Sequence, residues 1–149
     1  MSPLNLPPAQ LKITNSSGTP YVFDILRNKN IQITPEEWVR QQFVHYLINE
    51  KGYPKSLMGN EILLHLNGMQ RRCDTVVYDH SLNPLLIIEY KAPHIKITQE
   101  VFNQISRYNF VLKVKFLIVS NGLNHYCCKV DYEKKAFVFL QEIPHYADL

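Results

Sequence analysis

Two carboxylates and a lysine have a spacing that would let them act together. Residues 84–91 read PLLIIEYK, an apolar run that ends in Glu89 and Lys91. Side chains alternate across a strand, so Glu89 and Lys91 point to the same face. Asp74 lies near the start of the preceding strand-like run, residues 71–79. We expect the two runs to pair antiparallel through the turn at residues 79–84, which brings Asp74 beside Glu89 and Lys91.

Such a group of side chains can bind a metal ion. Two carboxylates with open positions hold a hard divalent cation, usually Mg²⁺, which also accepts phosphate oxygens. The cation polarises the phosphorus centre, and a nearby lysine can orient or deprotonate the attacking water. The set therefore indicates hydrolysis of phosphodiester bonds. The alternative is a structural ion pair between Glu89 and Lys91, because perturbed acid–base pairs also occur without a catalytic role.

A helix with clear start and stop signals precedes these strands. Thr34 is a suitable N-cap, Pro35 suits the first helical position, and Glu37 completes a capping box with Thr34. Gly52 and Pro54 end the helix. Its apolar stripe consists of Val39, Phe43, Tyr46 and Leu47.

The remaining pattern predicts an α/β fold with a mixed β-sheet flanked by helices. Asn67-Gly68 signals a hairpin, and Thr98 is a plausible cap for a helix over residues 98–112. The run 84–91 is nearly all apolar, which predicts a central strand covered on both faces. Strands are expected at residues 21–26, 61–66, 71–79, 84–91 and 115–122, followed by a closing hairpin of 124–132 and 135–143. Prolines make residues 1–20 a predicted flexible arm, and residues 21–149 a single domain.

The composition is that of an ordinary globular protein. The 149 residues carry a net charge of +3, which permits an anionic partner without requiring one. No apolar stretch reaches the roughly 20 residues of a membrane span, and the N-terminus lacks a signal peptide pattern. We therefore expect a cytoplasmic protein without a membrane partner. Three cysteines, two of them adjacent, fit neither a disulfide framework nor a zinc site, so plain thiols are expected.

The chain resembles a known nuclease family. Asp74, followed fifteen positions later by Glu89-Tyr90-Lys91, is similar to the D…ExK signature of the PD-(D/E)xK nuclease superfamily. Residues 21–126 resemble the N-terminal nuclease domain of type I restriction enzyme restriction subunits, especially its short stand-alone form. The similar blocks are FDILRNKNIQITPEEWVRQQFVHYLINEKGYP, RRCDTVVYD, LLIIEYKAP and QISRYN. This resemblance implies a restriction-endonuclease-like core.

The resemblance also implies roles for individual residues. Asp74 and Glu89 match the metal-binding acids, for Mg²⁺ with Mn²⁺ as a substitute, and Lys91 matches the catalytic lysine. Gln104 and Tyr108 match the QxxxY element, as a catalytic-site residue and a nucleic-acid contact. Ordinary helix residues, with Tyr108 in the core, are the alternative for this pair.

Glu36 matches the glutamate of the family's first helix, which lies four residues before an arginine, here Arg40. Helical phase places Glu36 with Val39 and Arg40 on the inward face and leaves Glu37 outside it. A role for Glu36 with the helix dipole alone is the alternative. The expected nucleic-acid contacts are Tyr108, Arg40, Arg72, Lys96 and Arg107, with a solvated surface as the alternative for the last three.

Two departures from the family are visible. Cys73 replaces the usual proline before the first aspartate, a position that shapes the turn and holds no metal. Restriction subunits also carry a DNA-translocating motor, whereas this sequence contains no GxxxxGK[ST] loop for ATP. Cleavage is therefore expected to be independent of a motor or to use one on another chain.

Two functions remain open at this stage. The first is a Mg²⁺-dependent endonuclease that hydrolyses DNA, acting alone, as a homo-oligomer or with a separate motor or specificity protein. The second is a nucleic-acid-binding or protein-interaction module with the same fold and no turnover. The intact set of Asp74, Glu89 and Lys91 favours the first.

Overall fold

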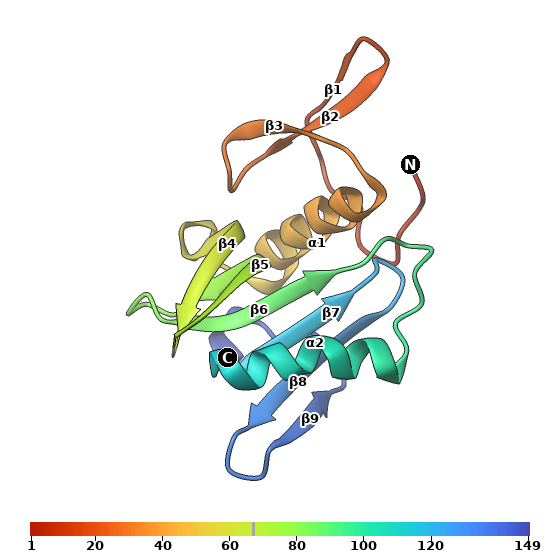
Figure 1. Cartoon of the computed structure of the whole chain (residues 1–149). Coiled ribbons are helices and arrows are strands. Elements are labelled where there is room, and N and C mark those ends of the chain that lie inside the picture. Colours follow the sequence, from red (N-terminus) through yellow and green to blue (C-terminus); the bar gives the residue numbers. More distant parts are fainter. Residues whose placement is uncertain (67) are drawn as a thin grey trace.

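The fold is a six-stranded mixed sheet between two helices, with a smaller sheet beyond one of them (Figure 1). The computed structural model of the chain describes residues 1–66 and 68–149, without the side chains of residues 66, 108 and 111. Helix α1 (Pro35–Lys51) lies on one face of the large sheet and α2 (Gln99–Leu112) on the other. This arrangement confirms the predicted α/β class and the mixed sheet flanked by helices.

The large sheet has the strand order β4-β5-β6-β7-β8-β9. Strands β6 and β7 are parallel, with α2 as their connection, and every other neighbouring pair is antiparallel. The prediction of a central, doubly covered strand is confirmed, because β6 lies between β5 and β7 and is buried from Leu86 to Tyr90. The strand bounds are Met58–Leu66 (β4), Met69–Tyr78 (β5), Pro84–Tyr90 (β6), Phe116–Ser120 (β7), His125–Asp131 (β8) and Ala136–Leu140 (β9).

Both helices begin at the predicted caps. Thr34 Oγ1 accepts a hydrogen bond from the N–H of Glu37 at 3.1 Å, and Thr98 Oγ1 accepts one from Val101 at 3.2 Å. Gly52 ends α1 in the left-handed region at φ 69°, where a residue without Cβ is favoured. Short 3₁₀ turns follow at Lys55–Leu57 and Tyr146–Asp148. None of the helices in the described part of the chain is long and apolar enough to cross a membrane.

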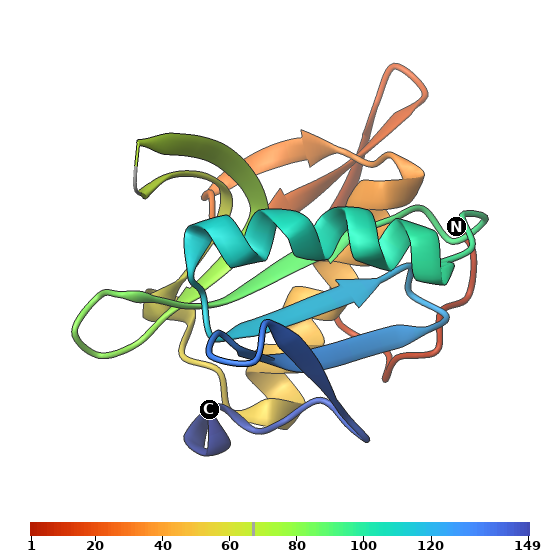
Figure 2. The ribbon, with the colours of Figure 1, turned by 60° about the horizontal axis from the view of Figure 1, so that its bottom comes forward.

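Apolar side chains fill both faces of the large sheet. Figure 2 shows α2 crossing one of these faces. Under α1, alternate residues of β6 and β7 pack against the helix stripe of Val39, Phe43 and Leu47. Under α2, the intervening residues pack against Phe102, Ile105 and Leu112. The three cysteines are buried free thiols, and burial raises the pKa of each to about 12. The predicted plain thiols are therefore confirmed.

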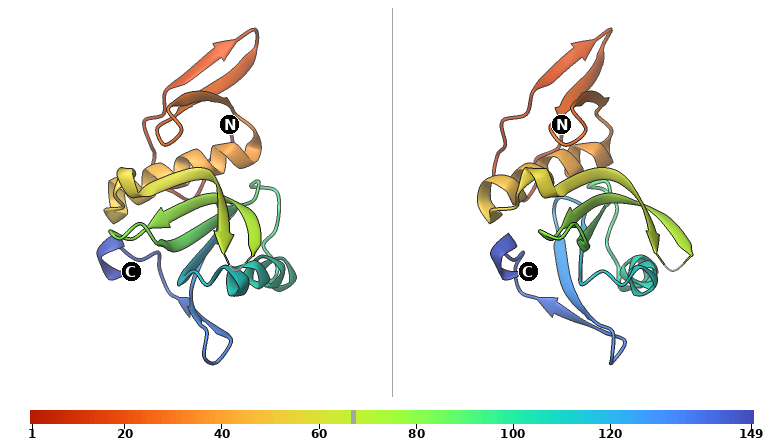
Figure 3. Two further views of the ribbon diagram at one scale, coloured as in Figure 1. Left: turned by 60° about the vertical axis from the view of Figure 1, so that its left-hand side comes forward. Right: turned by 90° about the vertical axis from the view of Figure 1, so that its left-hand side faces the viewer.

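The N-terminal segment differs from its prediction. Strands β1 (Ile13–Ser16), β2 (Thr19–Asp24) and β3 (Lys29–Gln32) form a three-stranded antiparallel sheet that stands beyond α1 (Figure 3). Regular structure therefore begins within the expected arm of residues 1–20, and the arm prediction is wrong from Ile13 onward. The Asn67 position of the expected hairpin turn lies outside the described residues, although β4 and β5 do pair antiparallel.

Residues 1–6 also dock on the domain, although they form no helix or strand. Trp38 Nε1 donates a hydrogen bond to the Ser2 carbonyl at 2.9 Å, and the Asn5 N–H donates to the Gly122 carbonyl at 2.8 Å. Leu4 and Leu6 pack against the core under α1. The first residues therefore contribute to the packing of the domain.

We predict that this docking stabilises the domain. Replacing Leu4 and Leu6 together with alanine removes half-buried apolar surface, which should cost about 2 kcal/mol of unfolding free energy. Trp38 is the single tryptophan, so loss of its Ser2 contact should shift its fluorescence emission to longer wavelength. Thermal melts and emission spectra measure both effects. Leu82→Ala, at a 68% exposed position, is the control and should change neither; an unchanged melting temperature in the double variant would show that the arm is not docked.

Candidate functional site

The two predicted metal-binding acids lie across from each other on neighbouring strands. Thr75 of β5 pairs with Ile88 of β6 in an antiparallel register, so the next residues, Asp74 and Glu89, are opposite one another. Asp74 is half-buried and Glu89 is 8% exposed. One carboxylate oxygen of Asp74, Oδ2, accepts a hydrogen bond from the N–H of Tyr90 at 2.9 Å. The expected antiparallel pairing of the two strands is confirmed.

This proximity strongly changes the protonation of Glu89. Burial and the negative charge of Asp74 raise the pKa of the Glu89 carboxyl to about 9. The charges of Arg71 and Lys91 act in the opposite direction, and Arg71 Nη2 lies 2.8 Å from Glu89 Oε1. With this pKa, the Glu89 carboxyl holds a proton at neutral pH when no metal ion is bound.

Two further charged residues lie near this pair of acids: Lys91, directly after β6, and Glu36, in α1. Lys91 directly follows β6, where its N–H donates to the Ser120 carbonyl of β7 at 2.8 Å. Glu36 is exposed in the first turn of α1, whereas Val39 and Arg40, predicted to share its face, are buried. The charges of the site nevertheless act on Glu36. Partial desolvation and the charge of Asp74 raise the pKa of Glu36, while Lys91 lowers it.

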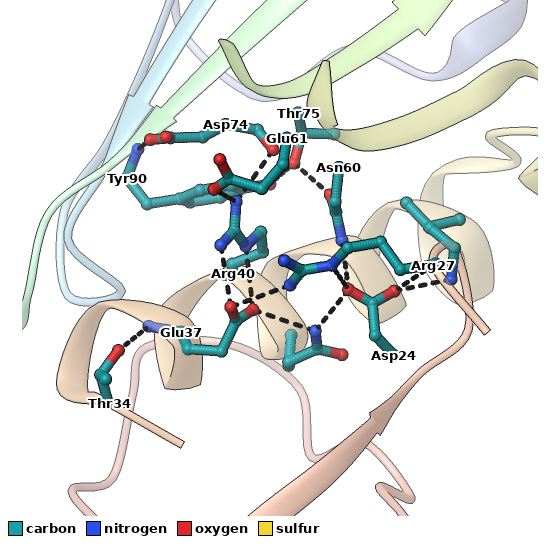
Figure 4. A network of polar contacts seen from close by, with 12 residues as sticks. Asp24, Arg27, Thr34, Glu37, Arg40, Asn60, Glu61, Asp74, Thr75 and Tyr90 are labelled. Carbon is teal, nitrogen blue, oxygen red and sulfur yellow. Dashed lines mark hydrogen bonds and ion pairs between the residues drawn. The ribbon is translucent and has the colours of Figure 1, made fainter. Parts of the chain in front are cut away.

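Glu37, which the sequence suggested only as a capping residue, is the buried acid of this helix. Its N–H makes the predicted bond to Thr34, but its carboxylate accepts hydrogen bonds from Arg40 at 2.8 and 2.9 Å (Figure 4). Arg27 and Gln41 add bonds at 2.9 and 3.0 Å. Despite burial, which acts in the opposite direction, these donors lower the pKa of Glu37. Glu37 is therefore a buried, charged and fully partnered carboxylate.

Arg40 lies between this carboxylate and the candidate site. Its Nη1 donates to Glu61 Oε1 at 2.6 Å and to the Asp74 carbonyl at 3.0 Å, while Nε and Nη2 bind Glu37. Arg40 is 8% exposed, and although burial lowers its pKa, the bonds to Glu37 and Glu61 raise it overall. All three guanidinium nitrogens are thus engaged within the chain. This placement does not suit the phosphate contact that the sequence suggested for Arg40.

Glu61 is a site neighbour that the sequence reasoning missed. It lies in β4 with φ 57°, a left-handed conformation that costs a non-glycine residue roughly 1–3 kcal/mol. The pairs Asn60–Thr75 and Ile62–Cys73 flank it, so Glu61 is across from Asp74. A signal was present in the sequence, since Asn60 and Glu61 are polar residues at the start of the apolar run that forms a hairpin with the strand of Asp74.

The other predicted residues are spread over the surface. Gln104, Arg72, Lys96 and Arg107 are exposed, and Arg72 lies near Glu61 at 4.0 Å. The prediction for Tyr108 concerns a side chain outside the described part of the chain. The roles predicted for all of these residues stay predictions.

The donor set formed by Asp74 in the middle of β5 and Glu89 near the end of β6 fits a divalent cation. Among the described residues, no three histidine, cysteine, aspartate or glutamate side chains form a preformed metal-binding group. However, Asp74 and Glu89 are oxygen donors, which Mg²⁺ prefers, and Mg²⁺ commonly takes one or two protein carboxylates and completes its shell with water and phosphate oxygens. The pKa of Glu89 stays raised by burial and by Asp74 even though Arg71 and Lys91 lie near it, and a divalent cation bound by both acids would favour their ionised forms.

A known protein family matches most of this chain. The sequence pattern of the family described as the type I restriction enzyme R protein N terminus matches residues 35–144. Among solved structures, a fragment described as an HsdR subunit of a type I restriction enzyme from Vibrio vulnificus YJ016 is similar, with 20% sequence identity and a TM-score of 0.47. The match covers 68% of this chain and only 22% of that chain. None of the curated proteins compared with the chain matches it.

We predict that Glu89 makes the domain less stable as the pH rises. The folded-state pKa of about 9 exceeds the ordinary value of 4.5, so folding binds a proton between these values. The stabilisation is complete below about pH 4.5 and falls by at most roughly 1.4 kcal/mol per pH unit up to about pH 9. Glu89→Gln mimics the protonated acid, so it should raise the melting temperature more at about pH 8 than at about pH 5.

Thermal melts in EDTA measure this difference. Glu50→Gln, which changes an exposed glutamate on α1, is the matched control and should give a pH-independent effect. An equal shift at both pH values in Glu89→Gln would contradict the raised pKa.

Proposed function

The chain belongs to the family of type I restriction enzyme R protein N termini, and we propose that it is a metal-dependent endonuclease that hydrolyses DNA phosphodiester bonds. The observation that carries the proposal is the pairing of half-buried Asp74 with buried Glu89, with Lys91 adjoining them after β6. Two neighbouring acidic side chains with a lysine beside them are the groups that metal-assisted phosphodiester hydrolysis needs.

The two acids, the lysine and the helix glutamate have different proposed tasks. Asp74 and Glu89 would hold Mg²⁺, or Mn²⁺ in its place, and the bound cation would supply Lewis-acid activation of the scissile phosphate and of water. Lys91 would orient the attacking water and stabilise the negative charge that develops on the phosphate oxygens. Glu36, exposed at the start of α1 and within the field of Asp74 and Lys91, would contact the water shell of this site.

The proposed substrate and partners follow from the same surface and the family. Arg72, Lys96 and Arg107 are exposed cations that can contact phosphates, and Gln104 is exposed on α2. DNA is the proposed substrate, because the family is that of restriction enzymes. The proposed partners are a second copy of this chain, or a separate motor or specificity protein that would supply DNA translocation or sequence recognition. Binding of DNA without cleavage would instead support an interaction module.

A plasmid-nicking assay with Mg²⁺, Mn²⁺ or EDTA tests this function, with single variants that separate metal binding from chemistry. Asp74→Ala should abolish both cleavage and Mn²⁺ binding, because it removes a cation ligand. Lys91→Ala should lower the cleavage rate by about 10²–10⁴-fold and leave Mn²⁺ binding nearly unchanged, because lysine is not a ligand. Cleavage rates and calorimetric Mn²⁺ titrations measure the two properties.

Lys55→Ala, which changes an exposed lysine in the 3₁₀ turn before β4, is the control and should cleave at the parent rate. If Lys91→Ala also cleaved at the parent rate, the activity would belong to another site or to a contaminant. Activity of the parent in EDTA would likewise exclude the proposed metal dependence.

DNA binding should weaken steeply with salt. Phosphate contacts release condensed counterions, so several contacts would reduce affinity by about tenfold or more between roughly 50 and 200 mM salt. Fluorescence anisotropy with labelled duplex DNA in EDTA measures this slope. Replacing Lys96 and Arg107 with alanine should make the slope shallower, whereas Lys55→Ala should not. Affinity that does not change with salt would argue for a protein-interaction module.

A further inference from the structure

Asp74 is held at two points by groups that have no role in the proposed chemistry. Its carboxylate Oδ2 accepts a hydrogen bond from the Tyr90 N–H at 2.9 Å, and its carbonyl accepts one from Arg40 Nη1 at 3.0 Å. The first contact joins β5 to β6, and the second joins β5 to α1 (Figure 4). The position of this aspartate therefore depends on the guanidinium of Arg40.

Glu61 determines where that guanidinium lies. In β4 the residues on either side of Glu61 are paired with β5, but Glu61 itself has φ 57° and leaves the regular strand conformation. Its Oε1 lies 2.6 Å from Arg40 Nη1, the same nitrogen that donates to the Asp74 carbonyl. Glu37 holds the other two nitrogens of Arg40. The guanidinium is thus fixed from both sides, with one N–H group aimed at Asp74.

We propose that Arg40 and Glu61 are positioning residues that fix Asp74 in the geometry needed to bind a divalent cation. This inference rests on the proposed function. Ligands of a cation must be held within a fraction of an ångström, and residues that support them typically change metal affinity or activity by about 10–100-fold when mutated. Arg40 thereby has a role within the domain in place of the DNA contact that the sequence suggested.

The first test compares metal affinity among three variants. Arg40→Lys keeps the charge, but a single ammonium cannot replace the three nitrogens that bind Glu37, Glu61 and the Asp74 carbonyl. Glu61→Ala removes a 31% exposed side chain and is expected to fold. Calorimetry should show that each weakens Mn²⁺ binding by about tenfold or more. Glu61→Gln, which keeps an oxygen acceptor, should restore part of the affinity.

Arg27→Lys is the matched control. Arg27 belongs to the same buried network, where it binds Asp24 and Glu37, but it is separated from Asp74 by Glu37 and Arg40. It should lower the melting temperature while leaving Mn²⁺ affinity within about twofold of the parent, because it does not support the ligand directly. An equal loss of affinity in Arg27→Lys and Arg40→Lys would assign the effect to general destabilisation and overturn the proposal.

A second readout does not require any metal. The Tyr90 N–H is bound by Asp74 Oδ2, so its hydrogen exchange in EDTA reports the position of the Asp74 side chain. Exchange should be faster by about fivefold or more in Arg40→Lys and Glu61→Ala, and unchanged in Arg27→Lys. Unchanged exchange in Arg40→Lys, or unchanged Mn²⁺ affinity when the parent binds Mn²⁺, would overturn the positioning role. A parent that neither binds Mn²⁺ nor cleaves DNA would disprove the function, while exchange at Tyr90 would still test the positioning.

Discussion

A buried guanidinium must be surrounded by acceptors, and the architecture around α1 follows from satisfying Arg40. Removing a charge from water costs several kcal/mol unless opposite charges and hydrogen bonds replace the solvent. Glu37 from the same helix, Glu61 from β4 and the Asp74 carbonyl from β5 supply those acceptors. Arg27 binds Glu37 as well as Asp24 at the end of β2, so the small N-terminal sheet joins the same network. Glu37 and Arg40 of α1 together thus link the two sheets.

The pKa values of the buried glutamates Glu37 and Glu89 are shifted in opposite directions. Glu37 receives donors from Arg40, Arg27 and Gln41, and its pKa falls despite burial. Glu89 is also buried, but it faces Asp74 as well as Arg71, and its pKa rises to about 9. Several hydrogen-bond donors thus keep Glu37 ionised, whereas burial and a neighbouring acid favour the protonated form of Glu89. Perturbation of this second kind is concentrated at sites that bind cations or perform chemistry.

Local patterns predicted part of this structure and could not reveal the rest. The Asp74–Glu89 pairing followed from strand alternation and one hairpin turn, which are properties of adjacent segments. The caps at Thr34 and Thr98 were equally local. The burial of Glu37 could not be predicted from the sequence. One side of α1 packs against apolar residues and another faces a polar network, and an apolar stripe in the sequence identifies only the apolar side. Glu61 depends on Arg40, 21 positions away, and on an unusual backbone conformation that its sequence does not signal.

When Glu89 ionises, its repulsion from Asp74 would act to separate β5 and β6 beside Thr75 and Ile88, where their pairing ends, and the polar network opposes this separation. The Tyr90 N–H binds Asp74 across the two strands, and the Tyr90 hydroxyl lies 2.9 Å from Thr75 Oγ1. Thr75 in turn donates to Asn60 Oδ1 at 2.7 Å, and Asn60 donates to the buried Asp24. The two acids therefore stay close because neighbouring residues hold their strands in register. On the proposed function, a divalent cation between the carboxylates would displace the proton from Glu89 and balance the charge of both acids.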